Sequence, residues 1–361
     1  MTEYADLADL LVDWLLHSPI QLANGQHQGA VAGWLGDHDQ PTFAYPEITG
    51  YYLSTMSYIS YTRPDLADAA NSAAGRALDW IRKATVAGQV VPTRIHLDGY
   101  AANHDWRNRA RFSFDLGMIL RGVISAGATF THPLTDDLRL TICSMIRPFC
   151  SPAGPIASHQ VNPGFDDSCL PPRWSTQKGP HHVKVAAGLS VVPEDDFLRS
   201  SGRATIEYWA GHDDDLSGVQ PHPAFYYIEG MLQAAKIYAS ERYLDVATSR
   251  YGRTLERLRG ESGAIDLSRS DVLAQALRIG CHLAAVGRLS AKYEDCLSEL
   301  AKSYCRFVRS DGSVLFRQDS PGITVQRNAW SAMFGLQALD LYRGLLVGDA
   351  RINSIALLHL I

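Results

Sequence analysis

Acidic residues stand near the start of several predicted helices whose other residues are almost all apolar. The first is Glu47, within the run Tyr-Pro-Glu-Ile-Thr-Gly-Tyr-Tyr at residues 45–52. Proline suits the first turn of a helix, and an acid there interacts favourably with the helix dipole. Tyr45, Tyr51 and Tyr52 add three aromatic rings that can stack on a sugar. Glu47 is therefore either a capping acid or a carboxylate that faces a pocket, and three rings exceed what capping needs.

A second acid, Asp115, lies one turn into an apolar run that extends from Phe112 to Leu120. An unpaired aspartate is costly to bury among such residues. It must therefore pair with Arg107 or Arg111 in a structural ion pair, or face a pocket where a ligand can interact with it. The second alternative makes Asp115 a candidate functional carboxylate.

Two later helices also carry acids at apolar positions. Glu229 lies in a run that begins at His222, and Tyr226 shares a helix face with that histidine. Glu229 either bridges two buried helices or faces the same pocket as His222. Asp271 follows Ser270, and these two residues can cap a helix without any further role. Asp271 nevertheless stands at the helix end where the other candidates gather.

Histidines and Arg–Trp pairs occur near the same helix ends. His181 and His182 are adjacent, so they point in different directions on a helix and form a poor pair of metal ligands. The chain has no His-x-x-x-His or His-Glu-x-x-His pattern, so we expect no metal and no other cofactor. Arginine can pair with a carboxylate or phosphate while tryptophan stacks on a sugar ring. Two segments combine these types: Arg173 with Trp174, and Arg327 and Asn328 with Trp330.

Twelve predicted helices carry these residues, as judged from apolar spacing and from glycine and proline punctuation. Odd-numbered segments are amphipathic and even-numbered ones are apolar on nearly every side, which predicts alternating outer and inner helices. Six hairpins of this kind form an all-α (α/α)6 barrel, and we expect a single domain over residues 1–361. The predicted helices are 4–17, 47–62, 65–86, 111–127, 134–149, 180–190, 194–209, 222–238, 242–256, 270–288, 291–307 and 328–344.

Two long loops precede inner helices and should lie over the pocket. The loop at residues 151–179 contains five prolines together with Arg173 and Trp174, and the loop at residues 87–108 carries Asp105 and Arg107. Irregular segments of this length are usually functional. Together with the helix starts, they give the candidate binding residues Tyr45, Tyr51, Asp105, Arg107, Arg173, Trp174, His181, His182, His222, Tyr226, Glu229, Arg327, Asn328 and Trp330.

Bulk composition excludes several classes of function. The formal net charge is -5 and no long basic run occurs, so nucleic acid is not an expected partner. No apolar stretch is long enough to predict a membrane span, and the first residues lack the pattern of a signal peptide. Six cysteines occur without a Cys-x-x-Cys pair, which favours reduced thiols and a cytoplasmic location. The expected partner is a small saccharide or another polar metabolite, and the oligomeric state is undetermined.

The architecture and a few motifs resemble the six-hairpin glycosidase superfamily. The run at residues 45–52 is similar to the inner-helix opening that carries the general acid in endoglucanase-like inverting families, which implies that role for Glu47. The Phe-Asp-Leu run around Asp115 resembles a second-helix aspartate that holds the sugar or assists the water. Residues 328–339 resemble the closing inner helix of such toroids. Asp271 and Glu229 both match the base, so the resemblance leaves that assignment open.

This resemblance implies glycoside hydrolysis by two carboxylates, one that protonates the leaving oxygen and one that activates water. Two alternatives remain. A sugar epimerase or isomerase on the same scaffold would use His181, His182 or His222 to move a proton next to a carbonyl. A non-catalytic protein would bind a saccharide or another polar small molecule through the same pocket.

Overall fold

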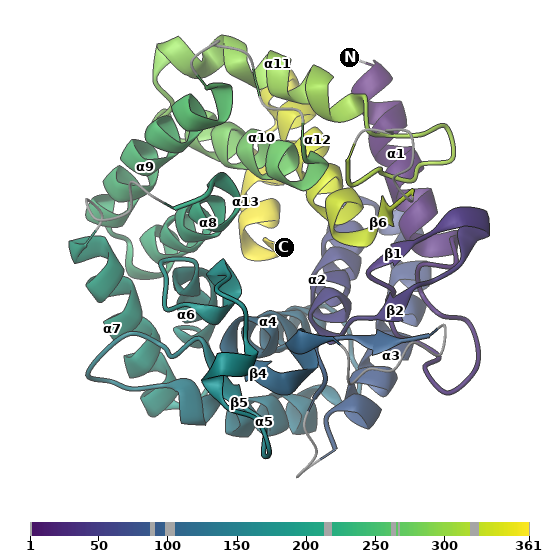
Figure 1. Cartoon of the computed structure of the whole chain (residues 1–361). Helices are drawn as coiled ribbons and strands as arrows, with labels where there is room; N and C mark the ends of the chain where they lie inside the picture. Colours follow the sequence, from purple (N-terminus) through teal and green to yellow (C-terminus); the bar gives the residue numbers. More distant parts are fainter. Residues whose placement is uncertain are drawn as a thin grey trace.

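Thirteen α-helices form a double ring in the part of the chain that the computed structural model describes, which is residues 2–86, 91–97, 105–212, 219–260, 265, 268–317 and 325–360 (Figure 1). The inner ring consists of α2 (Pro46–Thr62), α4 (Ser113–Thr129), α6 (His182–Leu189), α8 (Pro221–Tyr238), α10 (Ser270–Ala285) and α12 (Ala329–Val347). The outer ring consists of α1 (Thr2–His17), α3 (Ala67–Ala84), α5 (Thr135–Ile146), α7 (Asp196–Gly211), α9 (Glu241–Arg259) and α11 (Glu294–Cys305). This arrangement confirms the predicted (α/α)6 barrel.

Side-chain burial explains which helices lie inside. In α10, every residue from Ser270 to Leu283 is buried, since neighbouring helices cover all of its faces. In α3 the buried residues are mostly alanines spaced three or four apart, with Leu78, Trp80 and Ile81, and the intervening residues face solvent. None of the helices among the described residues is both long and apolar enough to cross a membrane.

Short antiparallel strand pairs lie at the N-terminal ends of the inner helices. They are β1 (Trp34–Leu35) with β6 (Arg327–Asn328), β2 (Phe43–Ala44) with β3 (Ile95–His96), and β4 (Ala110–Phe112) with β5 (His159–Val161). The β1–β6 pair joins the segment before the first inner helix to the segment before the last one, so the ring is closed by backbone hydrogen bonds as well as by helix packing.

Helix α13 (Ala350–Leu358) is the one described α-helix that the sequence patterns did not predict. It lies within the inner ring (Figure 1) and packs against α2, α8, α10 and α12, with hydrogen bonds to Gln233 and His282 in the C-terminal halves of α8 and α10. The Gln337 side chain donates to the carbonyl of His359 at 2.7 Å, and Arg121 donates to the carbonyl of Leu360 at 2.5 Å. Because α13 occupies this end of the barrel, the N-terminal ends of the inner helices form the end that is available to a ligand.

Helices α2 and α4 approach each other closely because glycines face each other at their crossing. A Cβ atom added to Gly122 would lie 2.1 Å from the carbonyl oxygen of Gly50, and one added to Gly50 would lie 2.6 Å from the Cα of Ile119. No side chain fits in that space. This contact fixes the spacing of the two helices that carry Glu47 and Asp115.

We therefore expect Gly122→Ala to destabilise the protein by about 1–3 kcal/mol, the usual cost of overpacking a rigid contact. Equilibrium denaturation with urea would measure it. Gly211→Ala provides the matched control, since Gly211 also lies in a helix but a Cβ there meets no atom within 4 Å. A Gly122→Ala variant as stable as the Gly211→Ala variant would contradict the close crossing.

Candidate active site

A cavity of about 930 Å³ opens at the N-terminal ends of the inner helices. A cavity of this size suits a small organic ligand such as a short saccharide. Each inner helix, or the residues just before it, contributes to the lining: Tyr45, Glu47, Phe114, Asp115, His181, His222, Tyr226, Arg269 and Trp330. Polar and aromatic residues from the N-terminal ends of all six inner helices therefore line one cavity.

Glu47 and Asp115 come from the adjacent helices α2 and α4 and both face this cavity. Burial, and then the charge of Asp115, raises the pKa of Glu47 to about 8. Burial likewise raises the pKa of Asp115 to about 7, although a hydrogen bond from the Thr93 hydroxyl to its Oδ2 at 3.0 Å opposes the shift. Burial thus brings the pKa values of both acids into the neutral range, where either carboxyl can hold a proton.

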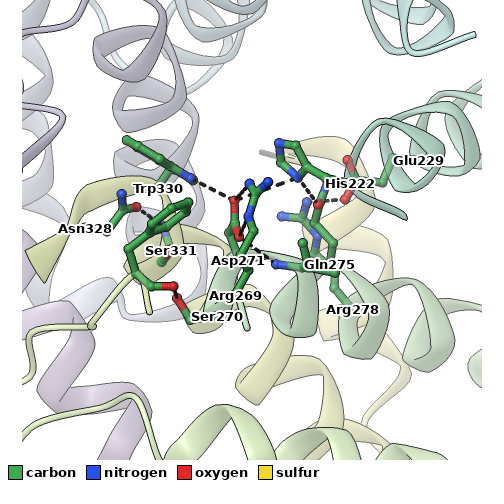
Figure 2. A network of polar contacts seen from close by, with 12 residues as sticks. His222, Glu229, Arg269, Ser270, Asp271, Gln275, Arg278, Asn328, Trp330 and Ser331 are labelled. Carbon is green, nitrogen blue, oxygen red and sulfur yellow. Dashed lines mark hydrogen bonds and ion pairs between the residues drawn. The ribbon is translucent and has the colours of Figure 1, made fainter. Parts of the chain in front are cut away.

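Asp271 does not line the cavity but holds two residues that do. Arg269 donates to both of its carboxylate oxygens, and the Trp330 indole donates to Oδ2 at 3.1 Å (Figure 2). Burial alone would raise the pKa of Asp271, but the Arg269 guanidinium holds it below the ordinary range. A carboxylate occupied in this way is a poor proton acceptor, so its role is to orient Arg269 and Trp330.

Glu229 is also absent from the cavity lining among the described residues, and it lies deeper in the barrel. It is fully buried and bonds to Lys184 Nζ at 2.7 Å. It also bonds to Arg278, as Figure 2 shows. Burial alone would raise its pKa, but the charges of Arg278 and Lys184 lower it below the ordinary value. Glu229 is therefore the anion of a buried ion cluster, the polar bridge between inner helices that was one of its two predicted roles.

Trp174 forms an aromatic wall with the residues of α8 and with His181. Its ring lies 4.9 Å from that of His181 and 5.8 Å from that of His222, in both cases edge to face. His222 Nδ1 hydrogen bonds to Gln275 Oε1 at 2.7 Å (Figure 2). Burial lowers the pKa of His181 well below its usual value and that of His222 to about 4, so both imidazoles are neutral at neutral pH.

The loop before α4 supplies cations to the opposite wall. Asp105 is buried, and its side chain accepts from Arg107 at 3.1 Å and lies 3.9 Å from Arg94. Arg107 and Arg94 line the cavity, whereas Asp105 does not. An ion pair of Asp115 with Arg107 or Arg111 was one of the two alternatives for that acid. Arg107 pairs with Asp105 instead and Arg111 donates to Gln160, while Asp115 faces the cavity.

Four other candidates lie outside the cavity lining. The Tyr51 ring lies beneath the cavity against Lys184, 5.2 Å from its Nζ, and His182 bonds to the carbonyl of Gly179 at 3.0 Å. Arg327 pairs with Asp39 and with the carbonyl of Gly36. Asn328 caps α12 by accepting from the backbone of Ser331 at 2.9 Å (Figure 2). These four side chains contact other protein groups and do not line the cavity, whereas Arg173 and Trp174 do.

Thr93 and Arg94 also line the cavity but were not among the predicted site residues. Their position in the loop at residues 87–108, which was expected to lie over the pocket, is the sequence signal that indicates them. His104 and Asp98, which belong to the same loop, lie outside the described residues. Among the residues that the structure does describe, no cluster of three or more histidine, cysteine or acidic side chains is arranged to hold a metal ion.

Comparison with solved structures finds the same (α/α)6 fold in several proteins of low sequence identity. The chain superposes on the cellobiose 2-epimerase of Spirochaeta thermophila DSM 6192 with a TM-score of 0.64 at 15% identity, over 98% of both chains. An α-1,6-mannanase from Salegentibacter sp. HEL1_6 gives 0.64 at 12% identity, over 95% of this chain and 99% of that one. An unsaturated glucuronyl hydrolase specific for heparin gives 0.66 at 11% identity, over 96% and 98%. No protein-family model matches the sequence, and a search of curated proteins finds no relative.

Proposed function

We propose that the protein hydrolyses a glycosidic bond in a small saccharide or glycoconjugate, with Glu47 as general acid and Asp115 as the second carboxylate. The observation that carries this proposal is the pair of buried acids, with pKa values of about 8 and about 7, facing a cavity among aromatic rings. An acid that retains its proton at neutral pH can protonate a leaving oxygen, and an ionised neighbour can activate water. The α-1,6-mannanase with the same fold is a glycoside hydrolase.

The proposed reaction assigns one proton transfer to each acid. Glu47 has the higher pKa, so it holds a proton and delivers it to the glycosidic oxygen as the carbon–oxygen bond breaks. Asp115 ionises first and accepts a proton from the water that attacks the anomeric carbon. Tyr45, Trp174 and Trp330 offer rings for stacking against the sugar. The six cysteines are free thiols, which suits the cytoplasmic setting that we propose.

The pH dependence of activity tests the assignment of the two acids. Below about pH 7 both are protonated and no base is present; above about pH 8 both are ionised and no acid is present. We therefore expect kcat/KM to follow a narrow bell with its maximum between these values. Initial rates on an aryl glycoside from pH 5 to 10 would measure the profile. A rate that stays constant from pH 5 to 9 would contradict this mechanism.

A sugar epimerase or isomerase is the second candidate, because two neutral histidines, His181 and His222, flank the Trp174 ring. The cellobiose 2-epimerase with the same fold makes this chemistry plausible for the scaffold. With histidine pKa values so far below neutrality, this activity should not change between pH 6 and 9.

One experiment separates the two functions. Saccharides incubated with the protein in deuterated water and followed by NMR should show new reducing ends without carbon-bound deuterium if the bond is hydrolysed. Proton abstraction next to a carbonyl would instead place deuterium on carbon and leave the glycosidic bond intact. The second result would replace the hydrolase assignment by the epimerase.

A further inference from the structure

The cavity is strongly cationic. Among the described residues, six lysine or arginine side chains line it and only two carboxylates do: the cations are Arg94, Arg107, Arg173, Lys178, Arg269 and Arg317, and the acids are Glu47 and Asp115. Because burial raises the pKa of both acids, together they contribute less than two negative charges near neutral pH. The lining thus has a positive excess that a neutral sugar would leave uncompensated.

Internal ion pairs neutralise only part of this charge. Asp271 binds Arg269 through both oxygens, which accounts for one cation. The Asp105 carboxylate pairs with Arg107 at 3.1 Å and with Arg94 at 3.9 Å, so one negative charge faces two guanidinium groups. Arg173, Lys178 and Arg317 form no ion pair with a described residue. Counted over the described residues, the cavity lining therefore carries more positive than negative charge.

Among these cations, Arg94 is the one best placed to bind an anion in the cavity. Its guanidinium carbon lies 4.3 Å from the centroid of the Phe43 ring and 5.5 Å from that of Tyr45, so the cation lies against both rings. The side chain is only 15% exposed and its Nε atom is buried without a hydrogen-bond partner among the described residues. A guanidinium that lies against aromatic rings and has an unused donor is suited to bind a carboxylate or a sulfate through parallel hydrogen bonds.

From this geometry we infer that the substrate is an acidic saccharide, and that Arg94, with Arg107 beside it, binds a carboxylate or sulfate group on the sugar. The inference deepens the proposed function, since it assumes a saccharide in this cavity, and it adds the charge class of the substrate. The N-terminal ends of the six inner helices point toward the same space and favour an anion there as well. The anion would lie beside Glu47 and Asp115, so the acidic sugar would occupy the position next to the bond that is cleaved.

Calorimetric binding of matched sugars tests the inference. Methyl uronides would be compared with the methyl glycosides that lack the carboxylate, in the gluco, galacto and manno series, together with the corresponding 6-sulfates. In at least one series we expect the acidic sugar to bind tenfold or more tightly than the neutral one, equivalent to about 1.4 kcal/mol. The uronide and the 6-sulfate arms decide between the two anions. Equal binding of acidic and neutral sugars in all three series would overturn the inference.

Variants locate the effect on Arg94. In Arg94→Gln the preference for the acidic sugar should fall below about threefold, whereas the control Arg242→Gln, an exposed residue of the outer helix α9, should retain it. Arg107→Gln should weaken the preference in the same direction, which keeps the test valid if Arg94→Gln does not fold. A preference that persists in both cavity variants would overturn the assignment to these arginines.

Turnover separates this inference from the proposed function. Tight binding of an acidic saccharide without cleavage would support the charge class and reject the hydrolase. Cleavage of neutral glycosides, with no gain from a carboxylate or sulfate, would support the hydrolase and reject the acidic substrate. Raising the salt concentration should weaken binding of the acidic sugar and leave the neutral one nearly unchanged, since screening acts only on the charged ligand.

Discussion

Replacing Glu47 with glutamine should lower kcat/KM for a glycoside with a poor leaving group by about 10²–10⁴-fold, the range that general acid catalysis contributes. Glutamine preserves the size of the side chain but cannot deliver a proton to the glycosidic oxygen. A glycoside whose leaving group is already acidic, such as a dinitrophenyl glycoside, needs no such proton and should lose much less. Comparing the two substrates in steady-state assays would therefore report on proton donation rather than on a general loss of activity.

A matched control is Glu241→Gln, since Glu241 is an exposed acid on α9 that pairs with Arg288 far from the cavity lining. This variant should keep full activity on both substrates. Equal losses on both substrates in Glu47→Gln would rule out a general-acid role for Glu47, and undiminished rates would move the chemistry to another residue.

The stability of the same variant gives an independent readout. In the folded protein the pKa of Glu47 is about 8, above the value of 4.5 for an unperturbed glutamate. The native state therefore binds a proton that the unfolded state releases, and this contribution to stability is lost as pH rises through about 8. Glutamine removes that dependence. Relative to the unmodified protein, Glu47→Gln should become more stable as pH increases from 6 to 9, as measured by urea denaturation.

The barrel could be predicted because each helix class has its own pattern of burial. Apolar runs such as that of α10, broken only by residues like Gln275 and Arg278, require neighbours on every side, and amphipathic runs such as α9 require solvent on one side. Strict alternation of the two classes leaves few arrangements other than a double ring. Helix α13 escaped prediction because its nine residues are too few to establish a period, and besides the preceding α12 it packs against α2, α8 and α10, which lie far from it in the sequence.

The location of the candidate site could be predicted from the sequence, but the set of residues that line it could be predicted only in part. Residues in the first turn of each inner helix, or just before it, reach the cavity, whereas Glu229 lies seven residues beyond His222 along α8. At 1.5 Å per residue this places it about 10 Å deeper in the barrel. Asp271 stands at the correct depth, but Arg269 and Trp330 occupy its carboxylate. Such pairings depend on segments far apart in the chain, and spacing alone does not reveal them.

Glu229→Ala should be the most destabilising of the substitutions considered, because Glu229 is the anion between two fully buried cations. Its oxygens bond to Lys184 Nζ at 2.7 Å and to Arg278, and all three side chains are inaccessible to solvent. Removing one partner of a buried ion pair leaves uncompensated charge and typically costs about 3–5 kcal/mol. Chemical denaturation at neutral pH would measure the loss, and the exposed control Glu241→Ala should change stability far less.

The pH dependence of the stability lost in Glu229→Ala shows whether the charge of Lys184 contributes to that loss. Burial already lowers the pKa of Lys184 to about 7, and without Glu229, which favours the protonated amine, the pKa should fall further. A lysine whose folded pKa is depressed binds fewer protons in the native state than in the unfolded chain, so stability rises with pH between the two values. At pH 9 the amine is neutral in both folded proteins, and the difference in stability between them should therefore be smaller than at pH 6. A loss that is the same at both pH values would indicate that Glu229→Ala acts through the cavity it leaves or through Arg278, which stays charged at both, and not through the charge of Lys184.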